Sequence, residues 1–355
     1  MRSTLTDLAS DPVALTRALV DIASVSGDEK EITDAVEAAL RSRPYLTVQR
    51  VGNVVRATTN LGRPRRVILA GHLDTVPHKD NFPSTLEGDR LYGCGTSDMK
   101  SGAALALHFA LTLPDPTDDV TYLFYDCEEV EAERNGLTHI GRDHPQWLMA
   151  DFAVLLEPTY GRVEAGCQGT ARAVVRLHGR RAHSARAWMG INAVHAAGPV
   201  LARLAAYEPR RPVIEGCEYH EGLNATFIRG GVAANVIPDL CEITVNYRFA
   251  PDRTPEQAVA HLREVFAGYD CDVVEVVAGA PPGLSAPAAR DFVAAVGAPP
   301  VAKLGWTDVA RFAALGIPAV NYGPGDPNLA HAPDEHVELP KILEGAQVLR
   351  RWLHR

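Results

Sequence analysis

The sequence predicts an α/β fold in which a mixed central sheet is interrupted by a small inserted domain. Three runs, "RVILAG", "VTYLFY" and "DFAVLL", are apolar without alternation, which is typical of strands buried on both faces, and helical stretches separate them. From about Thr170 the pattern alternates, as in "ARAVVRLHG" and "CEITVNYRF", which is typical of an antiparallel sheet with one exposed face. Because the pattern of buried strands and helices returns near the carboxyl terminus, the second domain is expected to be an insertion.

The elements of the first domain can be assigned in order along the chain. Ser10 or Asp11 can cap a first helix that begins at Pro12, and a second amphipathic helix fits Glu29 to Leu40. The segments "LTVQRV" and "NVVRATT" form a hairpin-like pair, and "RVILAGHLDT" then predicts a buried strand. Four later helices are expected at Gly102–Leu113, Asn192–Tyr207, Pro255–Phe266 and Leu339–Leu353.

Domain boundaries follow from the change of pattern. The order of elements after Thr170 fits a β-α-β-β-α-β insert, and the proline-rich "GAPPGLSAP" is typical of a linker. We therefore expect a first catalytic segment at residues 1–169, an inserted domain at 170–280 and a second catalytic segment at 281–355.

Composition excludes several classes of protein. The formal net charge of −9 argues against nucleic acid as a partner, since phosphate binding needs clustered Lys and Arg. The six cysteines are scattered, which indicates reduced thiols and no disulfide framework. No stretch reaches the ~20 apolar residues of a membrane span, and the amino terminus lacks a signal-peptide pattern. We expect a cytoplasmic protein that binds neither membrane nor nucleic acid.

Imidazole and carboxylate groups follow the buried strands, where ligands of α/β sheets gather. Two histidines and three carboxylates without a cysteine suit a two-zinc hydrolytic centre in which one carboxylate bridges the ions. Five positions after the strands or the glycine-rich turn "LYGCGTSDMKSG" present such groups, and some hold more than one carboxylate. They are His72 with Asp74, Asp98, Asp126 with Glu128 and Glu129, Glu157, and His331.

Two pairs within this set suggest a division of roles. Asp74 lies two residues after His72, so on a strand it can accept the second imidazole N–H and fix the tautomer that leaves the other nitrogen for a metal. Glu128 and Glu129 are adjacent and point in different directions on an extended chain, so that one can hold metal while the other takes a proton from water. Asp126 is expected to support the turn, and the neighbouring glutamates Glu131 and Glu133 are expected to be solvated.

Seven motifs resemble those of the M20 zinc metallopeptidase family, in family order and over nearly the whole chain. They are "GHLDTVP" (71–77), "GCGTSDMKSG" (93–102), "CEE" (127–129), "LEP" (156–158), "RAHSA" (181–185), "NVIP" (235–238) and "AHAPDE" (330–335). The resemblance implies a zinc-exopeptidase-like catalytic domain with an inserted ferredoxin-like lid domain through which two subunits form a homodimer.

The resemblance also implies a ligand set. Asp98 would bridge two Zn²⁺ ions per subunit, which Co²⁺ can replace, with His72 and Glu157 completing one site and Glu129 and His331 the other. Asp74 would orient His72, and Glu128 would be the general acid and base.

Residues of the insert and of a later loop receive roles from the resemblance alone. His183 matches a lid histidine that reaches the neighbouring subunit's active site and stabilises the developing oxyanion. The residues that match substrate contacts of the family are Asn235, Arg248, Thr307 and Arg311.

Two positions depart from the branch of the family that the chain resembles most. Members of that branch often carry Arg where this chain has Gln168, and Tyr where it has Arg186. Carboxylate-binding arginines are therefore expected to be redistributed, with Arg186 as the candidate replacement.

The expected reaction is amide hydrolysis of a small N-acyl amino acid. The branch that the chain resembles most cleaves N-succinyl-LL-2,6-diaminopimelate in lysine and diaminopimelate biosynthesis. The alternatives are another amidohydrolase of the family, namely an acetylornithine deacetylase, an aminoacylase or a dipeptidase, and a non-catalytic metal-binding module.

Overall fold

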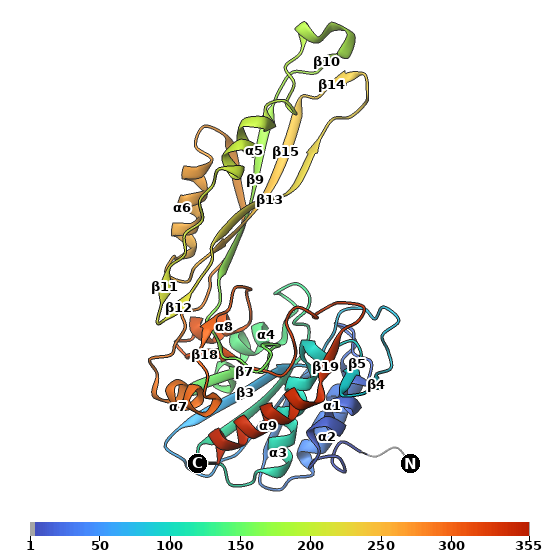
Figure 1. Cartoon of the computed structure of the whole chain (residues 1–355), viewed down its shortest axis with the longest axis vertical. Helices are drawn as coiled ribbons and strands as arrows, with labels where there is room; N and C mark the ends of the chain where they lie inside the picture. Colours follow the sequence, from blue (N-terminus) through green and yellow to red (C-terminus); the bar gives the residue numbers. More distant parts are fainter. Residues whose placement is uncertain (1–3, 355) are drawn as a thin grey trace. The chain divides into compact units, whose positions relative to one another are not determined.

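The computed structural model describes residues 4–354, so the outermost ends of the two expected catalytic segments, residues 1–3 and 355, lie outside the described residues. The chain forms two compact units (Figure 1). Among the described residues, unit 1 comprises 4–165, 282–301 and 311–354, and unit 2 comprises 166–281 and 302–310. Within the described range, no helix has the length and apolar character needed to cross a membrane.

Unit 1 is built on an eight-stranded mixed sheet. Neighbouring strands β6, β3, β7 and β18 run parallel, whereas β1, β2 and β8 pair antiparallel with their neighbours. In spatial order the strands are β1 (Thr47–Val51), β2 (Val54–Thr58), β6 (Asp119–Tyr125), β3 (Arg66–His72), β7 (Phe152–Leu155), β18 (Ala319–Asn321), β8 (Glu164–Ala165) and β17 (Val301–Ala302). The predicted hairpin and the predicted class, α/β with a mixed sheet, are confirmed.

Helices cover the sheet of unit 1 because its central strands have no polar face. All residues of β6 and β7 are buried, and α3 packs on β3 and β6 while α1, α2 and α9 pack against α3 on the same side (Figure 1). The helices of unit 1 are α1 (Pro12–Val20), α2 (Lys30–Arg41), α3 (Ser101–Thr112), α4 (Gly136–Asp143), α7 (Pro287–Val296) and α9 (Leu339–Leu353), and α8 (Val309–Ala314) continues from residues of unit 2. A small separate sheet joins β4 (Thr85–Glu87), β5 (Arg90–Tyr92) and β19 (His336–Glu338).

Unit 2 contains a four-stranded antiparallel sheet with two helices. Its elements follow the order β9, α5, β13, β15, α6, β16, and the strands lie in the order β13-β15-β9-β16, which is the ferredoxin-like arrangement. Their bounds are β9 (Gly169–His178), α5 (Ala197–Ala205), β13 (Gly222–Gly230), β15 (Leu240–Phe249), α6 (Pro255–Val265) and β16 (Asp270–Val277). The shorter pairs are β10 (Ala182–His183) with β14 (Val236–Ile237) and β11 (Val213–Ile214) with β12 (Cys217–Glu218).

The expected helix Asn192–Tyr207 was too long. The side-chain oxygen of Asn192 accepts hydrogen bonds from the backbone of Val194 and His195, and this local turn competes with helix formation. Helix α5 therefore begins only at Ala197. The first helix begins at Pro12, as expected, and ends at Val20. The other expected helices agree with the structure to within one residue at each end.

Candidate metal centre and catalytic residues

Three buried strands end at the same edge of the unit 1 sheet and position the first candidate ligands. His72 is the last residue of β3 and pairs in register with Tyr125, the last residue of β6. Strand β7 pairs with β3 up to Leu155, and Glu157 follows two residues later. Because parallel strands carry their carboxyl ends to one edge, His72, the turn after β6 and Glu157 are brought together.

Asp98 lies in a tight turn, Thr96–Lys100, just before α3. Gly95 has φ +84°, and a Cβ added there would lie 2.7 Å from the Cγ2 of Thr75, so that only glycine fits. The backbone N–H groups of Ser97 and Asp98 donate to Oε1 of Glu335, at 2.8 and 3.1 Å. Burial raises the pKa of the Glu335 carboxyl to about 7. Glu335 thus fixes the backbone that carries Asp98.

The five candidate ligands form two groups that share Asp98. Ligand atoms of His72, Asp98 and Glu157 lie within 4.8 Å of one another, and so do those of Asp98, Glu129 and His331. Oδ1 of Asp98 lies 3.2 Å from Nε2 of His72, whereas its Oδ2 lies 3.6 Å from Nε2 of His331. The two oxygens of one carboxylate therefore face two different imidazoles, which is the arrangement of a bridging ligand.

The charge balance of these groups fits divalent cations. Burial disfavours a charged imidazole at His72, yet the hydrogen bonds to Asp74 and Asp98 raise the pKa of His72 above its usual value. The hydrogen bond from Nε2 of His331 to Oε1 of Glu129, at 2.8 Å, likewise raises the pKa of His331. Both imidazoles attract protons because the carboxylates leave excess negative charge, and a metal ion would supply positive charge in the place of those protons.

Asp74 links the two halves of the site. Its Oδ1 lies 3.3 Å from Nδ1 of His72 and accepts the backbone N–H of Glu128 at 3.0 Å, and its Oδ2 accepts that of Glu129 at 3.2 Å. Burial opposes ionisation of Asp74, but the hydrogen bond from His72 and further donors outweigh it and lower the pKa of Asp74 to about 2. Asp74 is thus an anion at neutral pH.

The route by which Asp74 reaches His72 differs from the expected one. Strand β3 ends at His72, so Asp74 lies beyond it in a loop, and its backbone carbonyl at 3.1 Å is slightly nearer to Nδ1 than its carboxylate is. The tautomer of His72 is therefore set by two oxygens of one residue.

Asp74→Asn is expected to weaken metal binding about 10–100-fold. Both carboxylate oxygens accept N–H groups, so an amide NH₂ at either position faces a donor and the turn Glu128–Glu129 moves. Chelator competition followed by metal analysis measures the affinity. Asp28→Asn, at an exposed aspartate two residues after Ser26, is the control and should leave the affinity unchanged. An unaltered affinity in Asp74→Asn would contradict the role of this residue.

The acidic residues in the turn after β6 differ in burial and in their contacts. Glu128 and Glu129 are half-buried, while Glu131 and Glu133 are exposed, as expected. Burial, together with the nearby Glu29 carboxylate, raises the pKa of Asp126 to about 6. Glu129 lies against His331, and Glu128 is held through its backbone by Asp74.

The residues assigned to the lid lie in unit 2. His183 and Asn235 are exposed and adjacent, since β10 pairs with β14 and the N–H of Ser184 donates to the carbonyl of Asn235. Arg186 is exposed in the short helical segment Ser184–Met189, whereas Arg248 is half-buried near the end of β15.

Thr307 and Gln168 are buried in unit 2, and the carbonyl of Thr307 accepts the N–H of Ala310. Gln168 stands where related sequences often have Arg. Its Nε2 donates to the carbonyl of Leu304 at 3.1 Å and so supports the loop before Thr307. Arg311 is half-buried in α8 of unit 1.

Three supporting residues were missed by the sequence reasoning. Ser26 donates to Oδ2 of Asp74 at 2.7 Å, Glu29 accepts the N–H of Cys127, and Glu335 holds Asp98. Glu335 is the last residue of the motif "AHAPDE". A carboxylate that accepts backbone N–H groups can do so from any position in the sequence, so no spacing between residues marks its role.

A mixed α/β sheet with two imidazole–carboxylate groups that share one carboxylate defines the class of two-metal hydrolases. Residues 68–355 match the family model of peptidase family M20/M25/M40, and the chain belongs to this family.

Two relatives match over almost their full length. A putative succinyl-diaminopimelate desuccinylase, DapE, of Mycobacterium tuberculosis is 56% identical over 98% of this chain and 99% of the relative. A succinyl-diaminopimelate desuccinylase of Corynebacterium glutamicum is 48% identical over 98% of this chain and 97% of the relative. Among solved structures, a dinuclear metal binding peptidase of the M20 family from Bacillus subtilis has the same fold, with a TM-score of 0.68, 17% identity and 97% of each chain covered.

Proposed function

We propose that the chain is a two-zinc amidohydrolase that cleaves N-succinyl-LL-2,6-diaminopimelate to succinate and LL-2,6-diaminopimelate. The assignment as a hydrolase rests on Asp98, whose carboxylate belongs to both imidazole–carboxylate groups. Glu128 is held near these groups through its backbone N–H, which donates to Asp74. The choice of substrate rests on the two full-length relatives, which are both named for this activity.

Zinc fits the donor set. One ion would be held by His72, Asp98 and Glu157, and the other by Asp98, Glu129 and His331. Neutral imidazole and carboxylate oxygen are ligands of catalytic zinc, and Co²⁺ can occupy such sites. When bound, the two ions lower the pKa of water and neutralise negative charge that develops during the reaction.

Glu128 is the proposed proton carrier. Asp74 accepts the backbone N–H groups of both Glu128 and Glu129. The carboxylate of Glu129 faces His331 and belongs to a ligand group, whereas that of Glu128 belongs to neither group. Glu128 takes a proton from the attacking water and passes it to the leaving amine, which requires one carboxylate that changes protonation state in each cycle.

His183 has the tautomer needed to stabilise an oxyanion. Its Nδ1 accepts the backbone N–H of Ala185 at 3.0 Å, so in the neutral ring the proton resides on Nε2, which can donate a hydrogen bond. A donor of this kind stabilises negative charge on the carbonyl oxygen of the scissile amide. The exposed Arg186, three residues later, is the proposed partner for a substrate carboxylate.

We propose that unit 2 is a lid and dimerisation domain, corresponding to the insert at 170–280 between catalytic segments 1–169 and 281–355. His183 and Asn235 lie beyond the His178–Leu240 end of the sheet, and Arg248 lies near the other end of β15. Arg248 lies eight residue steps after Leu240 along the strand, roughly 26 Å at ~3.3 Å per step. A small N-acyl amino acid is much shorter than this, so one substrate would be contacted by both groups only if they come from two subunits.

Strand β13 supports a homodimer. It is an edge strand of the unit 2 sheet, and its residues from Asn224 to Gly230 are all exposed, including Phe227 and Ile228. An exposed apolar edge strand is a template for pairing with another strand. A second copy of the same edge would extend the sheet across a two-fold axis.

A cytosolic location completes the proposal. All six cysteines are free thiols, and five of them are buried. This agrees with a reducing compartment.

A substrate panel with metal analysis tests the function. The purified protein, with Zn²⁺ supplied, is assayed on N-succinyl-LL-2,6-diaminopimelate, N-acetylornithine and simple dipeptides. We expect a kcat/KM at least about 100-fold higher for the succinyl substrate, because a site built for a second carboxylate leaves its polar groups unpaired with an acetyl group. Turnover of only N-acetylornithine or dipeptides would overturn the substrate, and no turnover would favour the non-catalytic module.

A further inference from the structure

Glu29 is a buried carboxylate in unit 1 that the reaction described above does not use. We propose that Glu29 is a positioning residue that holds the turn Cys127–Glu129 and thereby sets the position of Glu128. The inference rests on the proposed role of Glu128 as the proton carrier.

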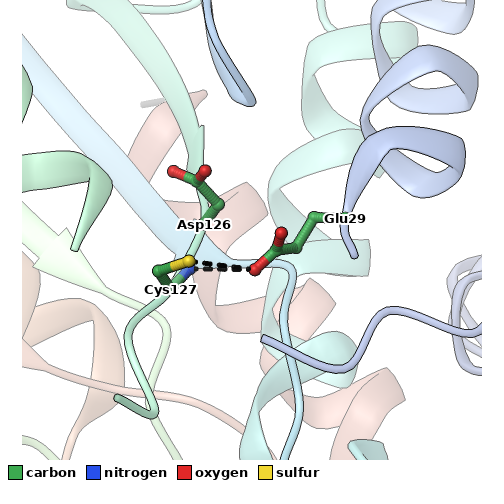
Figure 2. Close-up of side chains that lie close together, drawn as sticks. All are labelled: Glu29, Asp126 and Cys127. Atoms are coloured by element: carbon green, nitrogen blue, oxygen red, sulfur yellow. Dashed lines mark hydrogen bonds between the residues drawn. The ribbon is translucent and has the colours of Figure 1, made fainter. Parts of the chain in front are cut away.

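One oxygen of Glu29 gathers three donors. Oε1 accepts the backbone N–H of Gly27 at 2.7 Å, the backbone N–H of Cys127 at 3.2 Å and the thiol of Cys127 at 3.3 Å. Figure 2 shows both contacts with Cys127 converging on this oxygen. Glu29 is fully buried, and its other oxygen, Oε2, has no hydrogen-bond partner among the described residues, so the polar contacts of this side chain are concentrated on Oε1.

Cys127 needs this support because of its backbone. Its φ is +54°, a left-handed conformation that residues other than glycine adopt uncommonly. This conformation turns the chain between the end of β6 and Glu128. The hydrogen bonds that Cys127 donates to Glu29 hold the turn at the residue directly before the proton carrier.

Glu29 also completes a ring of contacts around the site. The segment 24–29 is tied to the loop after β3, since the hydroxyl of Ser24 donates to the carbonyl of Leu73 at 2.7 Å and that of Ser26 donates to Asp74 at 2.7 Å. Asp74 in turn accepts the N–H of Glu128. The turn that carries Glu128 is therefore held from two sides, by Asp74 at Glu128 and by Glu29 at Cys127.

A third metal ion is the competing interpretation of this cluster. Donor atoms of Glu29, Asp126 and Cys127 lie within 4.8 Å of one another. Oε2 of Glu29 is buried without a hydrogen-bond partner among the described residues, so it is the oxygen that a metal ion would bind. However, Oε1 of Glu29 already accepts two N–H groups and the thiol, and the contacts drawn in Figure 2 run to Cys127 and none to Asp126. The thiol donates to Oε1 only in its protonated form, whereas a metal ligand is a thiolate. The geometry therefore favours a support for the turn.

Kinetics of Glu29→Ala test the positioning role. We expect kcat to fall about 10–100-fold with KM within about threefold, and with the metal content unchanged, since a displaced catalytic group slows the chemical step. Glu29→Gln should recover most of kcat, because an amide oxygen can accept the same two backbone N–H groups. Val36→Ala removes buried volume from α2 and is the control for a general loss of stability, with kcat expected to stay at the wild-type value well below its Tm.

Two further measurements separate positioning from other roles. In the Glu128→Gln background, Glu29→Ala should cause little further loss, because both substitutions disable the same group. Amide hydrogen exchange at residues 127–129 should rise at least about tenfold in Glu29→Ala but not in Val36→Ala.

Unchanged exchange at residues 127–129, a full additional loss in the Glu128→Gln background, or a third bound metal ion that Glu29→Ala removes would each overturn the inference. Failure of the proposed function is distinguished by the wild-type protein, which would then turn over none of the N-acyl substrates. The exchange measurement needs no substrate and still decides whether Glu29 holds the turn.

Discussion

Glu128→Gln is expected to lower kcat about 10³-fold while both metal ions remain bound. Glutamine keeps the size and hydrogen-bonding capacity of the side chain but cannot carry a proton, and general acid–base catalysis contributes 10²–10⁴-fold. The backbone N–H of Glu128, which donates to Asp74, is unaffected by the substitution. Metal analysis and steady-state kinetics on the same preparation measure both quantities. Loss of metal from Glu128→Gln would show that this carboxylate is a ligand.

Glu129→Ala should give the opposite pattern. Its carboxylate lies 2.8 Å from Nε2 of His331 and belongs to the second ligand group, so its removal should lower the metal content to about one ion per chain. Glu131→Gln is the matched control, because Glu131 is an exposed glutamate of the same turn and should change neither metal content nor kcat. Equal metal loss in Glu128→Gln and Glu129→Ala would show that the roles of metal ligand and proton carrier are wrongly assigned.

The sequence predicts the central sheet well because its signal is local. An unbroken apolar run can be buried on both faces only in a covered sheet, and all residues of β6 and β7 are indeed buried. The polar residue after such a run then lies at the edge where neighbouring parallel strands end. This rule alone brings His72 and Glu157 into one group.

Residues that act through the backbone are harder to predict. Asp74 was expected to reach His72 along a strand, but β3 ends at His72, and the actual position of Asp74 depends on N–H groups of Glu128 and Glu129 some 54 residues later. Glu29 contacts Cys127 across 98 residues. Hydrogen bonds to backbone N–H groups impose no side-chain pattern at the other end, so single-sequence reasoning has no signal for them.

The lid residues show the same limit in another form. His183 and Asn235 became candidates only through the resemblance to the family. A single histidine in an antiparallel domain ordinarily packs or faces solvent and has no catalytic role. The structure adds a physical property that the sequence does not contain, namely the hydrogen bond from Ala185 that leaves Nε2 of His183 as the donor.

His183→Ala and Glu128→Gln are each expected to be nearly inactive, and a mixed dimer of the two should recover activity. Removal of one oxyanion donor costs about 10²–10³-fold in kcat. If His183 acts across the dimer, the subunit that keeps Glu128 receives His183 from its partner, so one of the two sites in each mixed dimer is complete. The two chains are co-expressed with different affinity tags and the mixed dimer is isolated through both.

The expected activity of the isolated mixed dimer is about half that of the wild-type dimer, since only one of the two equivalent sites of the proposed dimer would be complete. A mixed dimer of wild-type chain and Glu128→Gln is the control and should show the same half activity whether His183 acts in trans or in cis. No recovery in the test dimer, with half activity in the control, would place His183 in its own subunit's site or outside the reaction. It would also contradict the proposal that His183 and Arg248, at opposite ends of one sheet, contact the same substrate from two subunits.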